Sequence, residues 1–205
     1  KNSFELREGT LLPNFIDASL TLTEQGSPYL ISDSLIIAKD VVLKAEEGTL
    51  ILASKNAEIK VFGGLKFEGE ADNKIEIRPN IPNSYFHSIY FYLSNYENSL
   101  EHVSIYEGLI NSRNSTYSLN NVSIAIKNRP MQFGSKRPSI IWAWHGDISI
   151  DSLSLYGNGK GEGININWAD VKVLNSRFYN TPDAIEFINV TGGEISNNLV
   201  INSPD

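Results

Sequence analysis

The chain has 205 residues, a formal net charge of −7 and no cysteine. This length suffices for one domain with a full core, and the acidic balance argues against a phosphate backbone, so we predict no nucleic-acid partner. The lack of cysteine excludes disulfides, thiol catalysis and cysteine-ligated metals, and no apolar run approaches the length of about 18 residues that predicts a transmembrane segment.

Residues 1–28 are irregular and contain Pro13 and Pro28. We interpret them as an N-terminal cap segment over the first coil of a repeat fold, because an uncovered end invites edge pairing. We assign residues 29–205 to the repeat domain. We expect this domain to be truncated at its C-terminal end, because the pattern predicts another strand after Asp205.

From Leu30 onward, short apolar runs follow one another closely, and several alternate with polar residues at a period of two. Glycines punctuate these runs, and no ten-residue amphipathic helix fits among them. The predicted strands of this part are Leu35–Ile37, Val41–Leu43, Leu50–Leu52, Ile59–Phe62, Leu65–Phe67 and Ile75–Ile77.

A six-residue motif recurs in the middle of the chain, at Leu100–Ile105, Leu119–Ile124 and Ile150–Leu155. Its apolar residues at positions one, four and six should point inward, and the serine between the last two should face outward. The second copy follows the first by 19 residues and the third follows the second by 31. Residues 125–149 therefore carry an insertion of about ten residues, and inserted loops in a solenoid often carry binding.

The last part of the chain repeats itself after 22 residues. The repeat aligns Ile166–Asn167 with Ile188–Asn189, Asn175 with Asn197, and Asn180–Asp183 with Asn202–Asp205. Such a period without a helical pattern predicts a solenoid with one coil per repeat, and the two central asparagines should stack as an amide ladder. The predicted fold is all-β, a single-stranded right-handed parallel β-helix of roughly eight or nine coils.

These features resemble the right-handed parallel β-helix, or pectin-lyase-like, superfamily. The resemblance covers about residues 26–205; it rests on Gly26–Pro79 and on Pro182–Phe187 followed by Glu194–Asn198, which are similar to repeats of bacterial secreted and surface carbohydrate-associated proteins. It implies an extracellular, cell-surface or periplasmic location and a polysaccharide or glycan partner. It does not choose among activities, because this fold hosts lyases, hydrolases, adhesins and spacers.

The motifs of the polygalacturonases in that superfamily are incomplete here. Asn180–Asp183 matches only the start of the first motif, Trp144–Asp147 is the nearest string to Gly-His-Gly, and Arg-Ile-Lys is missing. The remaining catalytic candidates are His145 and the pair Asp183 and Asp205, whose carboxylates on adjacent coils about 4.8 Å apart would share a proton or a cation. The alternative is repeated turn chemistry, because Pro-Asp is common in turns.

We therefore assign no catalytic residue and no cofactor, with Ca²⁺ left open. The histidines His87, His102 and His145 show no metal-ligand spacing, so we predict no metal site. We interpret His102 as a turn residue beside Val103.

Outward-facing tyrosines form one candidate surface. Alternation around Phe91 places Ile89, Phe91 and Leu93 inside. The outward tyrosines of this run, and those that follow the last inward residue of the six-residue motif, are Tyr90, Tyr92, Tyr106 and Tyr156. Such rings on a parallel sheet form a stacking surface for sugars; alternatively, they only suit a strand or pack against a loop.

The insertion is the best candidate for a binding site. Its four cations are Lys127, Arg129, Lys136 and Arg137. Trp142 and Trp144 follow on one face of a strand, and Trp168 extends them about one coil later. Guanidinium groups bind carboxylate or sulfate and indoles stack on rings, so Arg129, Arg137 and the tryptophans predict a cleft for acidic sugars. The alternative is a solvated loop that covers the tryptophans.

The preferred function is a non-catalytic carbohydrate-recognising or display domain of a secreted or cell-surface protein. One alternative is a polysaccharide lyase or hydrolase acting on acidic glycans, and another is a structural spacer or assembly scaffold. The expected partners are a glycan, and further coils or another domain at the C-terminal end.

Overall fold

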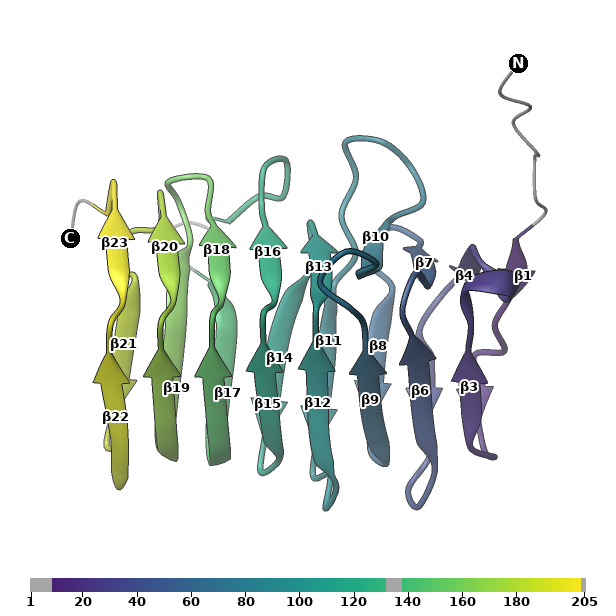
Figure 1. The fold of residues 1–205 in the computed structure, drawn as a ribbon, viewed down its shortest axis with the longest axis horizontal. Helices are drawn as coiled ribbons and strands as arrows, with labels where there is room; N and C mark the ends of the chain where they lie inside the picture. Colours follow the sequence, from purple (N-terminus) through teal and green to yellow (C-terminus); the bar gives the residue numbers. More distant parts are fainter. Residues whose placement is uncertain (1–8, 132–137, 204–205) are drawn as a thin grey trace.

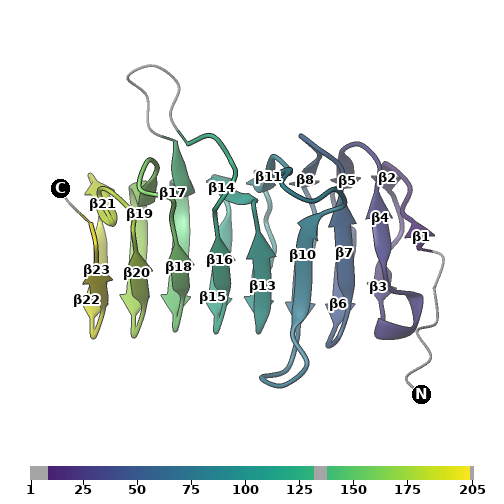
Figure 2. The ribbon, with the colours of Figure 1, turned by 90° about the horizontal axis from the view of Figure 1, so that it is seen from above.

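The structure is a computed structural model that describes residues 9–131 and 138–203. It is a right-handed parallel β-solenoid of about eight turns, with 57% of the chain in strands and 2% in helix, so the predicted all-β fold is confirmed. Successive coils lie side by side along one axis (Figures 1 and 2). No helix within the described ranges is long and apolar enough to cross a membrane.

Each coil has three parallel faces, which we call sheets 1, 2 and 3. Sheets 2 and 3 are joined through β17 and β19 into one 14-stranded sheet. Sheet 1 consists of β1 (Thr10–Leu11), β4 (Tyr29–Ile31), β7 (Leu50–Ala53), β10 (Ile75–Pro79), β13 (Val103–Tyr106), β16 (Ser123–Ala125), β18 (Ser154–Tyr156), β20 (Arg177–Tyr179) and β23 (Leu199–Ile201). Sheet 2 consists of β2 (Phe15–Ile16), β5 (Leu35–Ile37), β8 (Glu58–Val61), β11 (Ser88–Tyr92), β14 (Leu109–Arg113), the first halves of β17 (Ser139–Asp151) and β19 (Glu162–Leu174), and β21 (Ile185–Ile188). Sheet 3 consists of β3 (Leu20–Leu22), β6 (Val42–Glu46), β9 (Gly64–Glu68), β12 (Glu97–Glu101), β15 (Thr116–Asn120), the second halves of β17 and β19, and β22 (Gly192–Ser196). A short 3₁₀ turn, η1 (Glu24–Gly26), precedes β4.

The two longest strands, β17 and β19, run without a break from sheet 2 into sheet 3. The first half of β17 pairs with β14 and its second half with β15. The chain turns the corner between the sheets at His145 and Trp168, whose φ angles are 57° and 55°. The corner between sheets 2 and 3 is therefore built from residues in the left-handed region.

Inward-facing apolar residues stack in rows that run along the axis. The row from sheet 1 pairs in register as Ile51, Ile77, Ile105, Ile124, Leu155, Phe178 and Val200. The inward positions of the six-residue motif are all buried, as predicted; Leu100, Val103 and Ile105 are fully shielded from solvent. The core therefore consists of apolar side chains that stack on the equivalent side chains of the neighbouring coils.

The solenoid begins earlier than the expected boundary at residue 29. Strands β1 to β3 lie inside the predicted cap segment, and they pair in parallel with β4, β5 and β6. Short apolar pairs such as Phe15–Ile16 were too brief to reveal a period of two in the sequence. Residues 10–22 therefore form a coil of their own.

The predicted alignment of the last repeat is wrong by one residue in sheet 2. Asn167 pairs with Ile188 rather than with Asn189, whereas Val173 pairs with Ile195 as the 22-residue period requires. Asn189 instead has a φ of 53° and occupies the corner, where it is the equivalent of Trp168. Paired residues of β19 and β21 are 21 positions apart in the sequence, whereas paired residues of β19 and β22 are 22 apart. A single constant period cannot align both pairs of strands.

Leu93 also departs from its predicted inward position. Strand β11 ends at Tyr92, and Leu93 turns the corner with a φ of 52° and is 49% exposed. The alternation of inward and outward side chains holds only while the backbone stays extended. Ile89 and Phe91, which lie within the strand, are fully buried as expected.

The corner between sheets 3 and 1 carries the predicted asparagine ladder. The Nδ2 group of Asn197 donates to Oδ1 of Asn175 at 3.3 Å, and Nδ2 of Asn175 donates to Oδ1 of Asp151 at 3.0 Å. Both asparagines are left-handed, with φ of 50° and 56°. His102 has a φ of 49° in the same role, so its assignment to a turn is confirmed.

The ladder can be tested at Asn175. Alanine there should destabilise the fold by about 1–2 kcal/mol, because alanine tolerates positive φ poorly and cannot make the two amide contacts. Glycine tolerates the backbone but also loses the contacts, so Asn175→Gly should cost less. Urea denaturation of both variants measures the two terms. Equal losses in the two variants would show that the backbone angle contributes nothing.

Candidate functional site

The outer face of sheet 2 carries two rows of side chains in register. The row nearer the middle of the strands consists of Lys60, Tyr90, Asn111, Trp142, Asn165 and Glu186. The row nearer the corner consists of Tyr92, Arg113, Trp144, Asn167 and Ile188. We call the surface made by these tyrosines and tryptophans, Arg113, and the corner residues His145 and Trp168 the aromatic face.

The rings of the aromatic face lie close together across neighbouring coils. Trp142 and Trp144 project from the same side of β17 with ring centroids 6.5 Å apart, as predicted. The imidazole ring of His145 lies between two indoles. Its centroid is 5.9 Å from the ring centroid of Trp144 and 6.2 Å from that of Trp168. At the other end of the face, Tyr90 and Tyr92 meet edge to face at 5.4 Å, and Phe62 meets Tyr92 at 5.7 Å.

Two of these rings are held on strained backbone. A left-handed conformation costs an ordinary L-residue about 1–2 kcal/mol, whereas asparagine tolerates it. Asn114 and Asn189 hold the equivalent corner positions in other coils, with φ of 48° and 53°. His145 and Trp168 therefore occupy positions where asparagine would stabilise the fold more, and such strain is common at functional sites. Trp168 is 46% exposed.

Arg113 belongs to this face, and the sequence analysis missed it. It is exposed and lies between Tyr92 and Trp144 in the corner row. The second and third copies of the six-residue motif are 31 residues apart, and the residue 31 positions after Arg113 is Trp144. The sequence therefore contained a signal that Arg113 and Trp144 are neighbours.

A polar cluster borders the aromatic face at the start of the strands. Oε1 of Glu58 accepts a hydrogen bond from Oγ of Ser88 at 2.9 Å and lies 3.1 Å from Nδ1 of His87, and Nζ of Lys60 is 3.3 Å from Oε2. Burial raises the pKa of Glu58, but these hydrogen bonds and charges outweigh burial and lower it to about 2. Burial and the neighbouring Tyr92 raise the pKa of Tyr90, whose hydroxyl is a hydrogen-bond donor at neutral pH.

The depressed pKa of Glu58 predicts a definite pH dependence of stability. A carboxyl with an ordinary pKa of 4.5 that falls to about 2 on folding stabilises the fold above pH 4.5, and this stability is lost as the pH falls from 4.5 to 2. Glu58→Gln should therefore lower the melting temperature at pH 7 and have progressively less effect toward pH 2. Thermal unfolding across this range measures the difference. A difference that stays constant with pH would contradict the assignment.

The predicted ligand Arg129 lies inside the protein rather than on its surface. It is 7% exposed, and its Nη1 donates to the backbone oxygens of Phe86 and His87 at 2.5 and 2.8 Å. Its guanidinium carbon lies 5.0 Å from the ring centroid of Tyr85. Burial lowers the pKa of Arg129 to about 10, so the group stays charged at neutral pH. Arg129 ties the insertion to the loop before β11; the other predicted arginine, Arg137, lies outside the described residues.

A buried carboxylate holds the start of the insertion. Glu107 is 7% exposed, and its Oε1 accepts the backbone N–H groups of Lys127 and Asn128 at 3.0 and 2.8 Å. Its Oε2 accepts the backbone N–H of Arg129 at 2.9 Å, and Nδ2 of Asn128 donates to Oε1 at 3.1 Å. Glu107 and Arg129 together make the base of the insertion part of the folded scaffold.

Glu107→Gln tests this anchoring. Glutamine replaces one acceptor oxygen with a donor that faces backbone N–H groups, and hydrogen bonds to a charged group contribute about 1.5–3 kcal/mol. We expect lower stability and faster amide exchange over residues 127–131. Glu101→Gln is the matched control, because Glu101 is exposed and accepts one side-chain bond at 3.3 Å. Unchanged exchange in the Glu107 variant would show that the carboxylate does not hold the loop.

Tyr106 and Tyr156 face outward as predicted, but from a different sheet. Both lie in sheet 1, in the register row that links them through Ala125, and they are 39% and 45% exposed. Tyr156 stacks on Tyr179 at 4.8 Å with an interplanar angle of 4°. They do not extend the aromatic face, because that face lies on sheet 2. The period of two predicts which residues point outward, but it does not predict the sheet to which they belong.

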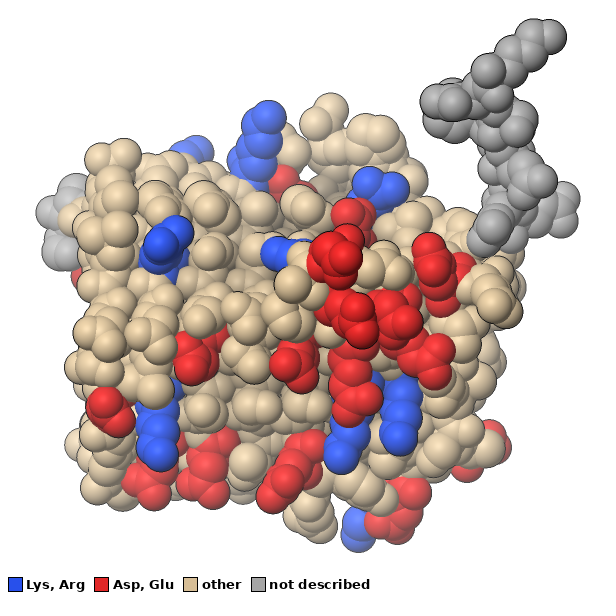
Figure 3. All heavy atoms as spheres, in the orientation of Figure 1, with Lys and Arg blue, Asp and Glu red and all other residues tan. Residues whose placement is uncertain are grey.

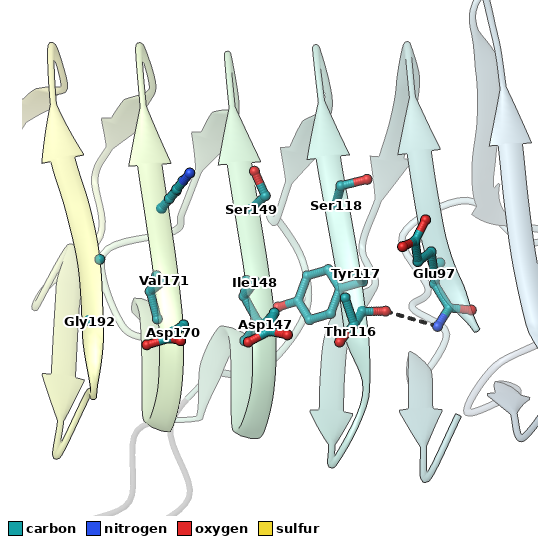
Figure 4. A pocket seen from close by; sticks show the side chains of 13 residues that line it. Glu97, Thr116, Tyr117, Ser118, Asp147, Ile148, Ser149, Asp170, Val171 and Gly192 are labelled. Carbon is teal, nitrogen blue, oxygen red and sulfur yellow. Dashed lines mark hydrogen bonds between the residues drawn. The ribbon is translucent and has the colours of Figure 1, made fainter. Parts of the chain in front are cut away.

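A hollow lies around the corner, on sheet 3. It is a groove of about 700 Å³ in which Asp147 and Asp170 lie in register on β17 and β19, followed by Thr116 and Glu97 on the next coils (Figure 4). Asp170 accepts a hydrogen bond from Thr191 at 2.7 Å. The one aromatic residue of the lining, Tyr117, is fully buried and stacks on Phe91 in the core. The groove therefore offers oxygen atoms but no ring for stacking.

The predicted carboxylate pair lies only in part within the described residues. Asp183 lies in the turn before β21 with a φ of 47°, and its backbone oxygen accepts the N–H of Gly163, while Asp205 lies outside the described residues. Among residues 9–131 and 138–203, no three His, Cys, Asp or Glu side chains are grouped so that they would hold a metal ion.

The fold and this surface define a parallel β-solenoid with an outward aromatic face. No protein-family model matches the chain, and no curated protein or solved structure is significantly similar to it. The functional argument therefore rests on the chemistry of the surface.

Proposed function

We propose that this protein is a non-catalytic carbohydrate-binding domain that holds a glycan chain against the aromatic face. The observation that carries the proposal is the run of rings Trp142, Trp144, His145 and Trp168, which spans two coils with centroid separations of 5.9–6.5 Å. Rings of this kind offer apolar area to the faces of sugars, and the indole and hydroxyl edges offer hydrogen bonds to sugar hydroxyls.

The geometry of the solenoid supports a polymeric ligand. Trp142, Trp144 and His145 follow one another on β17, and Trp168 lies on the neighbouring strand β19, so the rings form an open patch across two coils rather than a closed pocket. A linear polymer that crosses this patch would meet several rings at once, and each additional contact adds to the affinity.

The best alternative is a polysaccharide hydrolase or lyase that uses the groove of sheet 3. The observation that favours it is the register pair Asp147 and Asp170, two exposed carboxylates on adjacent strands. Paired carboxylates perform general acid and base catalysis on glycosidic bonds. Release of shorter oligosaccharides from a bound polymer, abolished by Asp147→Asn, would establish this alternative.

We further propose that the chain is a pectin-lyase-like β-helix of a secreted or cell-surface protein. The support is the resemblance of its repeats, together with a surface suited to extracellular polymers. A spacer or assembly scaffold remains the third candidate, and the behaviour of Trp168 separates it from the first.

Trp168→Asn tests glycan binding without destabilising the fold. Asparagine relieves left-handed strain of about 1–2 kcal/mol, which offsets the apolar contact that is lost, so the melting temperature should stay within about 2 °C of the parent. Removal of one stacking ring should weaken glycan binding about tenfold. A glycan array followed by titration calorimetry measures the binding.

The matched control is Tyr156→Ala, which removes a ring of similar exposure from sheet 1. It should leave glycan binding unchanged. A stable Trp168 variant that binds every glycan as the parent does would overturn the proposal and favour the scaffold.

A further inference from the structure

We propose that Arg113 makes the aromatic face selective for glycans that carry an anionic group, a carboxylate or a sulfate, at the edge of the stacked sugar. This inference rests on the proposed function and names the ligand class of the same surface. The predicted cations of the insertion do not supply this role, because Arg129 is buried and bonded to backbone oxygens.

The first support is the position of Arg113. It pairs in register with Tyr92 on one side and Trp144 on the other. Adjacent strands lie about 4.8 Å apart, so a sugar that stacks on either ring brings its substituents within reach of the guanidinium. A guanidinium binds carboxylate and sulfate through two parallel hydrogen bonds.

The second support is that the side chain of Arg113 is not used elsewhere. Within the described part of the chain it makes no hydrogen bond and no ion pair; the salt bridges there join Lys60 and His87 to Glu58 and Arg78 to Glu76. An exposed arginine without a counter-ion loses little by binding an anion, because no existing pair must be broken.

The third support is the distribution of charge over the rest of the molecule. Acidic side chains gather over β6, β7, β9 and β10 on the face formed by sheets 1 and 3 (Figure 3). In that patch Glu46, Glu68 and Glu101 lie in register on neighbouring strands. Sheet 2 lies on the far side (Figure 1). An anionic polymer is repelled by this acidic face, which disfavours docking on sheets 1 and 3.

The groove around the corner sets the orientation of the ligand. Asp147 follows the corner residue His145 by two positions and points into a groove with Asp170 and Glu97. Lys172 also lines the groove, two residues beyond Asp170 on β19. Close to Asp147, however, anionic substituents would meet carboxylates, whereas neutral hydroxyls would find acceptors. The ligand should therefore carry its anionic groups toward Arg113 and its hydroxyls toward Asp147.

The test uses polymers in matched neutral and anionic forms. The pairs are hydroxyethyl cellulose with carboxymethyl cellulose and with cellulose sulfate, fully methyl-esterified with de-esterified polygalacturonan, and dextran with dextran sulfate. Binding to the whole protein, Arg113→Gln and Trp168→Asn is measured by calorimetry at low and at high salt. Arg177→Gln, an exposed arginine of sheet 1, controls for the change in net charge.

We expect the parent to prefer the anionic member of at least one pair by about tenfold, which is the lower range for a hydrogen bond to a charged group. Arg113→Gln should abolish this preference and its salt dependence while it retains binding that depends on Trp168; Arg177→Gln should change neither. The carboxylated and sulfated arms show which anion is bound.

Binding that depends on Trp168 but is equal for both members of every pair would overturn this inference and leave the proposed function intact. A preference for the anionic member that survives in Arg113→Gln would overturn the role of Arg113. Absence of binding that depends on Trp168 across all pairs and the glycan array would overturn both.

Discussion

Parallel pairing of each coil with the next, at a spacing of about 4.8 Å, is the constraint on which the rest of the molecule depends. It places equivalent residues in rows along the axis, so apolar residues bury one another inside and the asparagines of one corner bond amide to amide. The same constraint acts on the surface: a ring placed in one coil lies close to whatever the next coil offers at that position. The surface therefore carries rows of side chains parallel to the axis, and such a surface suits an extended polymer.

The molecule uses its charged groups in two distinct ways. Glu107 and Arg129 are buried and satisfy backbone groups of two loops, so their charges serve the scaffold. Arg113 projects from the aromatic face without a partner among the described residues, so its charge faces solvent and any ligand. Burial rather than residue type separates the two roles, because an arginine whose donors are already bonded cannot also bind a sugar acid.

The two surfaces that meet at the corner between sheets 2 and 3 differ in chemistry. One carries rings and Arg113, and the other carries carboxylates, hydroxyls and Lys172 in a groove. His145 and Trp168 stand at the border on left-handed backbone. The outward aromatic residues are what the proposed binding needs, whereas the register pair Asp147 and Asp170 is what a catalytic alternative would need. Both interpretations place the ligand along this edge.

The sequence by itself determined the solenoid, the inward positions of the six-residue motif and the outward direction of Trp142 and Trp144, because alternation and coil-length repeats are local properties of an extended chain. Only the tertiary structure decided which outward residues share a surface. It separated Tyr106 and Tyr156 from Tyr90 and Tyr92, buried Arg129 and brought Arg113 beside Trp144. These outcomes depend on the length of each turn, which differs from coil to coil, so distance along the sequence does not show which outward residues become neighbours.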